Sequence, residues 1–141
     1  MVVAADSEDM KLPEPLLTGT HAPEGSASLV VLVHGHTGSA GELELLHREL
    51  ANAVPRSTRF LVSSAASTWK SQASSERKGG LRIDDLDYAA LRLSQEVSSA
   101  MKEMQVQGVS GPCCLSFVGC GTGGLVVRAA LPWLPEYRDS F

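Results

Sequence analysis

The sequence has few aromatic residues and no excess of basic ones. Aromatic side chains make up 5% of the 141 residues, which is too few for platforms on which nucleic-acid bases stack. Lysine and arginine number 12 against 16 acidic residues, so the net charge of -4 at pH 7 repels a phosphate backbone. We therefore expect no nucleic-acid partner.

Long apolar runs and paired cysteines are also missing. No stretch approaches the roughly 18 apolar residues of a transmembrane helix, and the N-terminal residues MVVAADSEDMKLPEPLL carry acids where a secretory signal carries basic groups. Cys113, Cys114 and Cys120 fall within eight positions, with no distant partner and no histidine nearby in sequence. We therefore expect no disulfide, metal site or cofactor, no transmembrane segment, and a cytoplasmic protein.

What the chain does have is an alternation of strands and helices. The proline- and serine-containing residues 1–28 are expected to be a flexible lead-in, and residues 29–141 a single domain. Hydrophobic patterns predict strands, helices and one long loop in the order 29–33 (strand), 43–54 (helix), 60–62 (strand), 63–80 (loop), 86–107 (helix), 114–118 (strand) and 125–131 (helix). Such alternation predicts a mostly parallel sheet with right-handed crossovers, an α/β fold in three layers.

Local signals mark the ends of the predicted helices. Ser39 followed by Glu42 has the spacing of a capping box, in which the serine side chain caps the helix start. Pro55 closes this first helix. Gly108 is expected to end the second helix, and Pro132 to stop the third.

The third strand runs into a glycine-rich turn that decides the interpretation. A nucleophile elbow has the pattern G-x-S-x-G between a strand and a helix, and its glycines allow the backbone and the helix to approach closely. The corresponding residues are Gly119, Cys120, Gly121, Thr122 and Gly123, with Gly124 next. The pattern is complete except at its centre, because Gly121 has no side chain with which to attack a carbonyl.

The first strand ends in a second element of the same kind, His34-Gly35. Many esterases place an oxyanion-binding N–H just after such a pair, and a second N–H follows the nucleophile. Those donors would be the N–H groups of His36 and Thr122, and the turns 35–38 and 119–122 would form the mouth of a pocket. Taken alone, His34-Gly35 is also consistent with an ordinary strand end.

Three segments resemble the DUF676 family of serine esterases, which contains lipase-like α/β-hydrolases. They are LVVLVHGHTGSAGEL (29–43), GLRIDDLDYAALRLSQEV (80–97) and LSFVGCGTGGLVVRAAL (115–131). The third is the most specific, since it aligns with the family's F-V-G-H-S-L-G-G and places its serine on Gly121 and its histidine on Cys120. The resemblance implies the N-terminal half of an α/β-hydrolase-like three-layer sandwich, and hydrolysis of carboxylic esters or lipids.

The chain departs from this family in its catalytic triad. In this fold the acid and the histidine follow the nucleophile, yet the last histidine of this sequence is His47, and only Glu136 and Asp139 are acidic beyond the elbow. We therefore predict a catalytically incompetent domain that is a fragment, a decayed copy or a repurposed binding or regulatory module. A lipid or ester remains the expected ligand, and the sequence indicates no particular protein partner.

Two other interpretations compete with the esterase-like one. Cys120 could act as the nucleophile, but a pattern centred on it places Val118 and Thr122 where glycines belong. Gly119-x-Gly121-x-x-Gly124 also matches the dinucleotide fingerprint, with Asp139 near the distance of a ribose-binding acid. That acid should end a second strand, which the prolines of LPWLP (131–135) oppose.

Overall fold

A computed structural model describes residues 27–36, 38–67, 83–108 and 114–140. Except for its last two residues, the predicted lead-in 1–28 lies outside them. Within the described residues three strands form one sheet in the order β2-β1-β3, and both pairs of neighbours are parallel. The strands are β1 (Ser28–Val33), β2 (Thr58–Ser63) and β3 (Cys114–Gly119). The predicted strands and their parallel arrangement are confirmed, each strand being one to three residues longer than its pattern.

The register aligns the carboxyl ends of the three strands. Val33, the last residue of β1, pairs with Ser63 at the end of β2 and with Gly119 at the end of β3. The loops that leave these ends therefore start at one edge of the sheet, where open α/β sheets bind ligands. The elbow and the His34-Gly35 pair are both at this edge.

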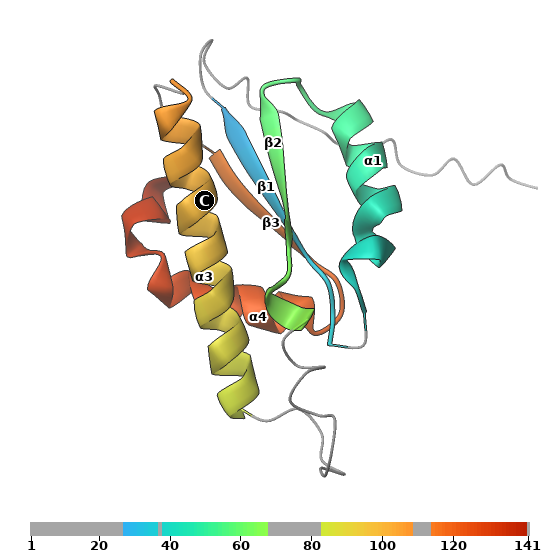
Figure 1. The fold of residues 1–141 in the computed structure, drawn as a ribbon, viewed down its shortest axis with the longest axis vertical. Coiled ribbons are helices and arrows are strands. Elements are labelled where there is room, and N and C mark those ends of the chain that lie inside the picture. The colour runs from blue at the N-terminus through green and yellow to red at the C-terminus, as the bar shows by residue number, and fades with distance from the viewer. Residues whose placement is uncertain (1–26, 37, 68–82, 109–113, 141) are drawn as a thin grey trace, which may run out of the picture.

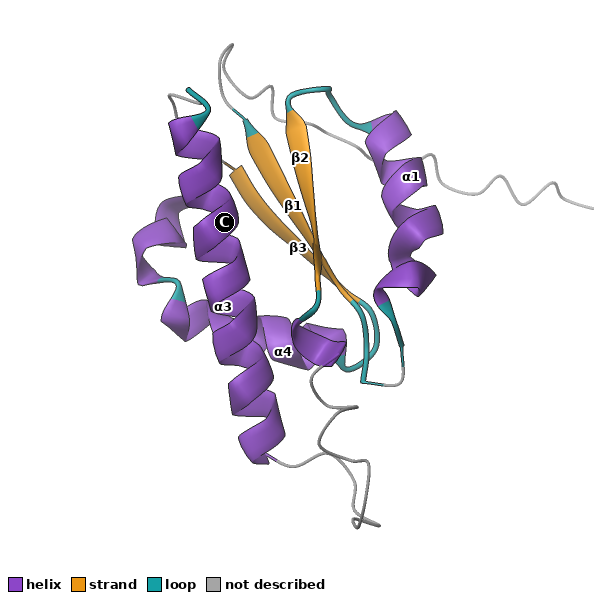
Figure 2. Ribbon diagram, in the orientation of Figure 1, coloured by secondary structure: helices purple, strands orange, loops and turns teal. Residues whose placement is uncertain are grey.

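The helices cover the two faces of the sheet (Figures 1 and 2). One face carries α1 (Glu44–Ala53), and the other carries α3 (Ile83–Val106) and α4 (Gly123–Ala130). Short 3-10 turns flank them: η1 (Ala40–Leu43), η2 (Ala65–Ser67), η3 (Leu131–Trp133) and η4 (Pro135–Ser140). The chain thus has the three-layer α/β arrangement that the alternation of elements predicts.

The hydrophobic core lies between the sheet and the α3–α4 layer. Leu29, Val31 and Val33 alternate along β1 and point to this side, because successive side chains of a strand face opposite ways. The core also contains apolar residues of α3, α4 and the C-terminal turns, namely Ala89, Ala90, Leu93, Val97, Met101, Met104, Val126, Ala130, Leu134 and Tyr137.

The α1 layer is packed more loosely than the α3–α4 layer. None of the ten residues of α1 is buried, although Leu32 of β1 and Leu43 just before α1 are. Leu46 and Leu50 are half-buried, and the ring of His47 packs against Phe60 of β2 with centroids 4.8 Å apart. The apolar stripe that predicts this helix therefore faces the sheet without being fully enclosed by it.

Three local predictions need correction. Ser39 does precede a helical turn, but its side chain makes no capping hydrogen bond, because the Glu42 N–H donates instead to the Ser39 carbonyl oxygen at 3.1 Å in a 3-10 turn. The predicted loop 63–80 begins with the last residue of β2 and then η2, and its residues 68–80 lie outside the described parts. The last helix begins at Gly123 rather than Leu125, since the elbow leads directly into it.

Candidate functional site

The turn between β3 and α4 has the backbone shape of an elbow. Gly121, at its tip, has a φ of 56° in the left-handed region, which residues with a Cβ rarely adopt. Hydrogen bonds hold the turn on both sides: Cys120 N–H donates to the Val33 carbonyl at 2.9 Å, and Gly123 N–H donates to the Cys120 carbonyl at 3.0 Å. The chain therefore reverses direction sharply at Gly121 before entering the helix.

The two flanking glycines are required by close contacts. A Cβ on Gly119 would lie 2.5 Å from the nitrogen and 2.6 Å from the Cα of Gly124. A Cβ on Gly123 would collide with the carbonyl oxygen of Val33 and lie 2.8 Å from that of His34. Both clashes involve backbone atoms, which cannot swing away as a side chain can. This explains in physical terms why an elbow needs glycine at these two positions.

Gly121 differs from its two neighbours because nothing surrounds it. A Cβ built there would meet no atom within 4 Å, so the tip of the elbow has room for a side chain. The only obstacle is its positive φ, which costs a residue with a Cβ about 1–2 kcal/mol. The glycine at the nucleophile position is therefore not demanded by packing, and it leaves the elbow without a reactive group.

The His34-Gly35 loop packs directly against the elbow. His34 is buried, with 1% of its surface exposed, and its Nδ1–H donates to the Gly35 carbonyl at 2.8 Å. Gly35 must approach the elbow closely, because a Cβ on it would lie 3.1 Å from the carbonyl oxygen of Cys120. The structure thus brings together the two loops that the sequence assigns to one site.

The residues of the two expected oxyanion donors, His36 and Thr122, are joined by a hydrogen bond to the threonine side chain. The His36 N–H donates to the side-chain oxygen Oγ1 of Thr122 at 2.7 Å. That hydroxyl therefore stands where a substrate oxygen would accept the same hydrogen bond. Sequence reasoning considered only the N–H of Thr122 and missed its side chain; the available signal was a threonine where the DUF676 pattern has leucine. Within the described residues, no hydrogen bond uses the Thr122 N–H itself.

A second polar cluster, also missed from sequence, closes the carboxyl end of β2. The Ser63 and Ser64 hydroxyls donate to the two carboxylate oxygens of Glu96 on α3, each at 2.6 Å. The Ser64 N–H adds a bond of 3.2 Å to Glu96, and Ser63 Oγ accepts from the Ala65 N–H at 3.1 Å. These hydrogen bonds fix α3 to the carboxyl end of β2.

The remaining candidates are the cysteines at the start of β3 and in the elbow. Cys114 is exposed and Cys120 half-buried, while Cys113 lies outside the described residues. Among the described residues, no three His, Cys, Asp or Glu side chains gather as a metal site. None of the helices in the described segments has the length and apolarity needed to cross a membrane.

The dinucleotide interpretation gains nothing from the structure. Asp139, its expected ribose-binding acid, lies in the 3-10 turn η4 and not at the end of a strand. The segment Leu131–Trp133 is also a 3-10 turn, so no strand precedes Asp139 in the required place. The glycine-rich turn follows β3, whereas the fingerprint follows the first strand of its unit.

Together, the parallel sheet, the glycine elbow and the adjoining His34-Gly35 loop define an α/β-hydrolase-like domain. Residues 23–140 match the family model described as "Putative serine esterase (DUF676)". The chain belongs to this family, because the match covers most of its length. Neither a curated protein nor a solved structure matches the chain.

Proposed function

We propose that this domain is a non-catalytic member of its serine esterase family, which binds an ester- or lipid-type ligand without cleaving it. The observation that carries the proposal is Gly121, which occupies the tip of a correctly shaped elbow and has no side chain. The proposed domain comprises residues 29–141, preceded by the lead-in 1–28.

The geometry of the turn supports the absence of covalent chemistry. Acyl transfer through an elbow needs a nucleophile at the residue with positive φ, and that residue is Gly121 rather than Cys120. Cys120 comes one position earlier, and its N–H and carbonyl are both used to hold the turn. The oxyanion side is altered too, since Thr122 Oγ1 already accepts the His36 N–H. These two departures affect the two parts on which the family's reaction depends.

Other features of the same turn support retained binding. The Thr122 N–H comes at the start of α4, where backbone N–H groups and the helix dipole favour a carbonyl or carboxylate oxygen. The space above Gly121 is open, since a Cβ at this position would meet no atom within 4 Å. The Thr122 hydroxyl can donate its own proton while it accepts from His36. An ester group placed there would find donors but no attacking atom.

Catalysis and binding are tested separately on the full chain. Hydrolysis of p-nitrophenyl butyrate should not exceed the rate in buffer, and Gly121→Ser should not restore it, because a serine without a general base is a weak nucleophile. Turnover that Cys120→Ala abolishes would overturn the proposal and make Cys120 the nucleophile.

Binding is measured with methyl butyrate by amide chemical shifts. Saturable shifts are expected at Gly35, His36, Gly121 and Thr122, and Thr122→Trp should reduce them by filling the space beside the elbow. Lys102→Glu, an exposed change on α3, is the matched control and should leave the shifts unaltered. Saturable shifts confined to other residues, or none at all, would refute the binding half of the proposal.

A further inference from the structure

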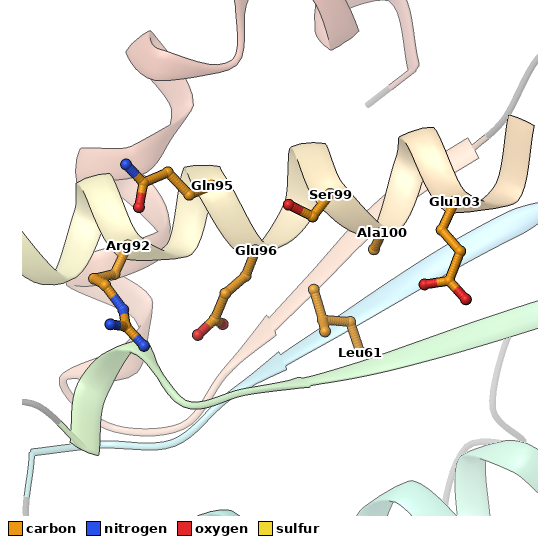
Figure 3. A pocket seen from close by; sticks show the side chains of 7 residues that line it. All are labelled: Leu61, Arg92, Gln95, Glu96, Ser99, Ala100 and Glu103. Carbon is orange, nitrogen blue, oxygen red and sulfur yellow. The ribbon is translucent and has the colours of Figure 1, made fainter. Parts of the chain in front are cut away.

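A groove of about 440 Å³ lies between β2 and α3, away from the elbow (Figure 3). Its apolar part consists of Leu61 on β2 and Ala100 on α3, both half-buried. Its polar rim comes from one face of α3 and includes Arg92, Glu96, Ser99 and Glu103. The groove therefore has an apolar floor between charged ends, with the edge strand as one of its sides.

The strand that borders this groove has one edge that no strand of the described residues covers. Within the described sheet, β2 pairs with β1 only, so the backbone N–H and C=O groups on its other side have no strand partner. Such an edge is a template for another extended segment, whose main chain supplies hydrogen bonds while its alternate side chains enter adjacent pockets. Here the adjacent pocket is the groove under α3.

Contacts at both ends hold the two sides of the groove in place. At one end, Glu96 accepts the Ser63 and Ser64 hydroxyls, as described above. At the other end, Arg59 of β2 donates to Gln107 Oε1 at 2.8 Å, and Gln107 donates to Glu103 at 3.0 Å. The groove is thus preformed, which lowers the entropic cost of filling it.

The charges in the groove are separated along its length. Arg92 and Glu103 stand eleven positions apart on α3, which corresponds to about 16 Å at the rise of a helix. An extended chain covers that distance in about five positions, and two side chains four positions apart, about 13 Å, are the nearest such pair on one face of a strand. Arg92 makes no ion pair with any described residue. A strand with an acid and a base four positions apart, and an apolar residue midway, would match these charges and the floor.

We propose that the groove binds an extended peptide segment of a partner protein, added as an antiparallel strand to the edge of β2 that no described strand covers. β2 runs from the Glu103 end toward the Glu96 end, and antiparallel pairs are the more stable kind. The N-terminal acid of the peptide then meets Arg92, its central apolar side chain covers Leu61 and Ala100, and its C-terminal base meets Glu103. This interaction is independent of the ligand proposed for the elbow.

The test uses the full chain and the capped heptapeptide SETVTKS, followed by amide chemical shifts. Saturable changes are expected in β2 and in residues 92–103 of α3, and none in α1. The peptide SKTVTES, with its charges exchanged, should bind about five-fold more weakly, since two partly exposed ion pairs are lost. Ser99→Trp should abolish binding by filling the groove, while Lys102→Glu, exposed outside it, should bind as the unaltered chain does.

A charge-exchange variant tests whether Arg92 and Glu103 contact the charged residues of the peptide. The double change Arg92→Glu with Glu103→Lys should prefer SKTVTES over SETVTKS by about the same factor, while circular dichroism confirms that it folds. Absence of binding at millimolar peptide, or a preference that does not invert, would overturn the proposal. So would concentration-dependent dimerisation that shifts the same β2 amides without peptide, because the occupant would then be a second copy of the chain.

Discussion

The steric account of the elbow predicts a graded response to placing alanine at each of three glycines. Gly119→Ala puts a methyl group 2.5 Å from the Gly124 nitrogen. The backbone must shift by about 0.9 Å to relieve this clash and reach ordinary contact at 3.4 Å. Gly121→Ala meets no atom but must adopt a φ of 56°. Gly124→Ala, inside the first turn of α4, meets nothing and has no such φ.

These differences translate into three distinct stabilities. Overpacking against a fixed backbone should lower the free energy of unfolding of Gly119→Ala by about 3 kcal/mol. The left-handed φ alone should cost Gly121→Ala about 1 kcal/mol. Gly124→Ala should be neutral or more stable by up to about 1 kcal/mol, because alanine restricts the unfolded chain and favours the helix.

Equilibrium unfolding in urea, followed by circular dichroism at 222 nm, measures all three variants under the same conditions. The order of stability should be Gly124→Ala, then Gly121→Ala, then Gly119→Ala. If Gly119→Ala were as stable as Gly124→Ala, the close approach of β3 and α4 at this turn would be refuted. If Gly121→Ala were as costly as Gly119→Ala, the claim of open space at the nucleophile position would be wrong.

Three further outcomes follow from single contacts. Glu96→Ala should lower the free energy of unfolding by about 2 kcal/mol in urea titrations, because it leaves the buried Ser63 hydroxyl without its acceptor, while the exposed Gln95→Ala should change it by less than about 0.5 kcal/mol. Burial, reinforced by Glu136, raises the pKa of Tyr137 above 10.0, so the stability linked to it is complete below pH 10 and is lost as the pH rises through the folded-state pKa. Tyr137→Phe should lack this alkaline loss of stability. If the stability–pH curves of Tyr137→Phe and of the unaltered chain had the same shape between pH 8 and 11, the prediction would be contradicted. Thr122→Val should speed amide hydrogen exchange at His36 by removing its acceptor, whereas an unchanged rate would show that Oγ1 is not that acceptor in solution.

The sequence predicts the layers of this fold well because its hydrophobic periods are unambiguous. The continuous apolar run of β1 indicates a strand buried on both faces, and it is the central strand. The apolar stripe of the second predicted helix identifies α3, whose end is marked by Gly108 with its φ of 84°. The flanking glycines Gly119 and Gly123 were also predictable, because the close approach of strand and helix leaves no room for a Cβ at either position.

What the sequence could not predict depends on pairings between distant residues. The hydrogen bond from His36 to Thr122 joins residues 86 positions apart, and the Ser63–Glu96 bond joins residues 33 apart. Neither pairing has a local pattern, since it exists only once the sheet aligns the strand ends. The capping box failed for the opposite reason: its spacing was right, but the 3-10 turn gave the Glu42 N–H a backbone acceptor before the Ser39 side chain could supply one.

The most direct test of the central claim is the intact mass of the chain after incubation with an alkyl fluorophosphonate, which marks activated serine nucleophiles covalently. Because Gly121 carries no side chain at the tip of the elbow, the account predicts an unchanged mass after prolonged exposure to excess reagent. A stoichiometric phosphonyl adduct, located by peptide mapping to one serine, would contradict it if the adduct does not form when the chain is denatured in urea before incubation.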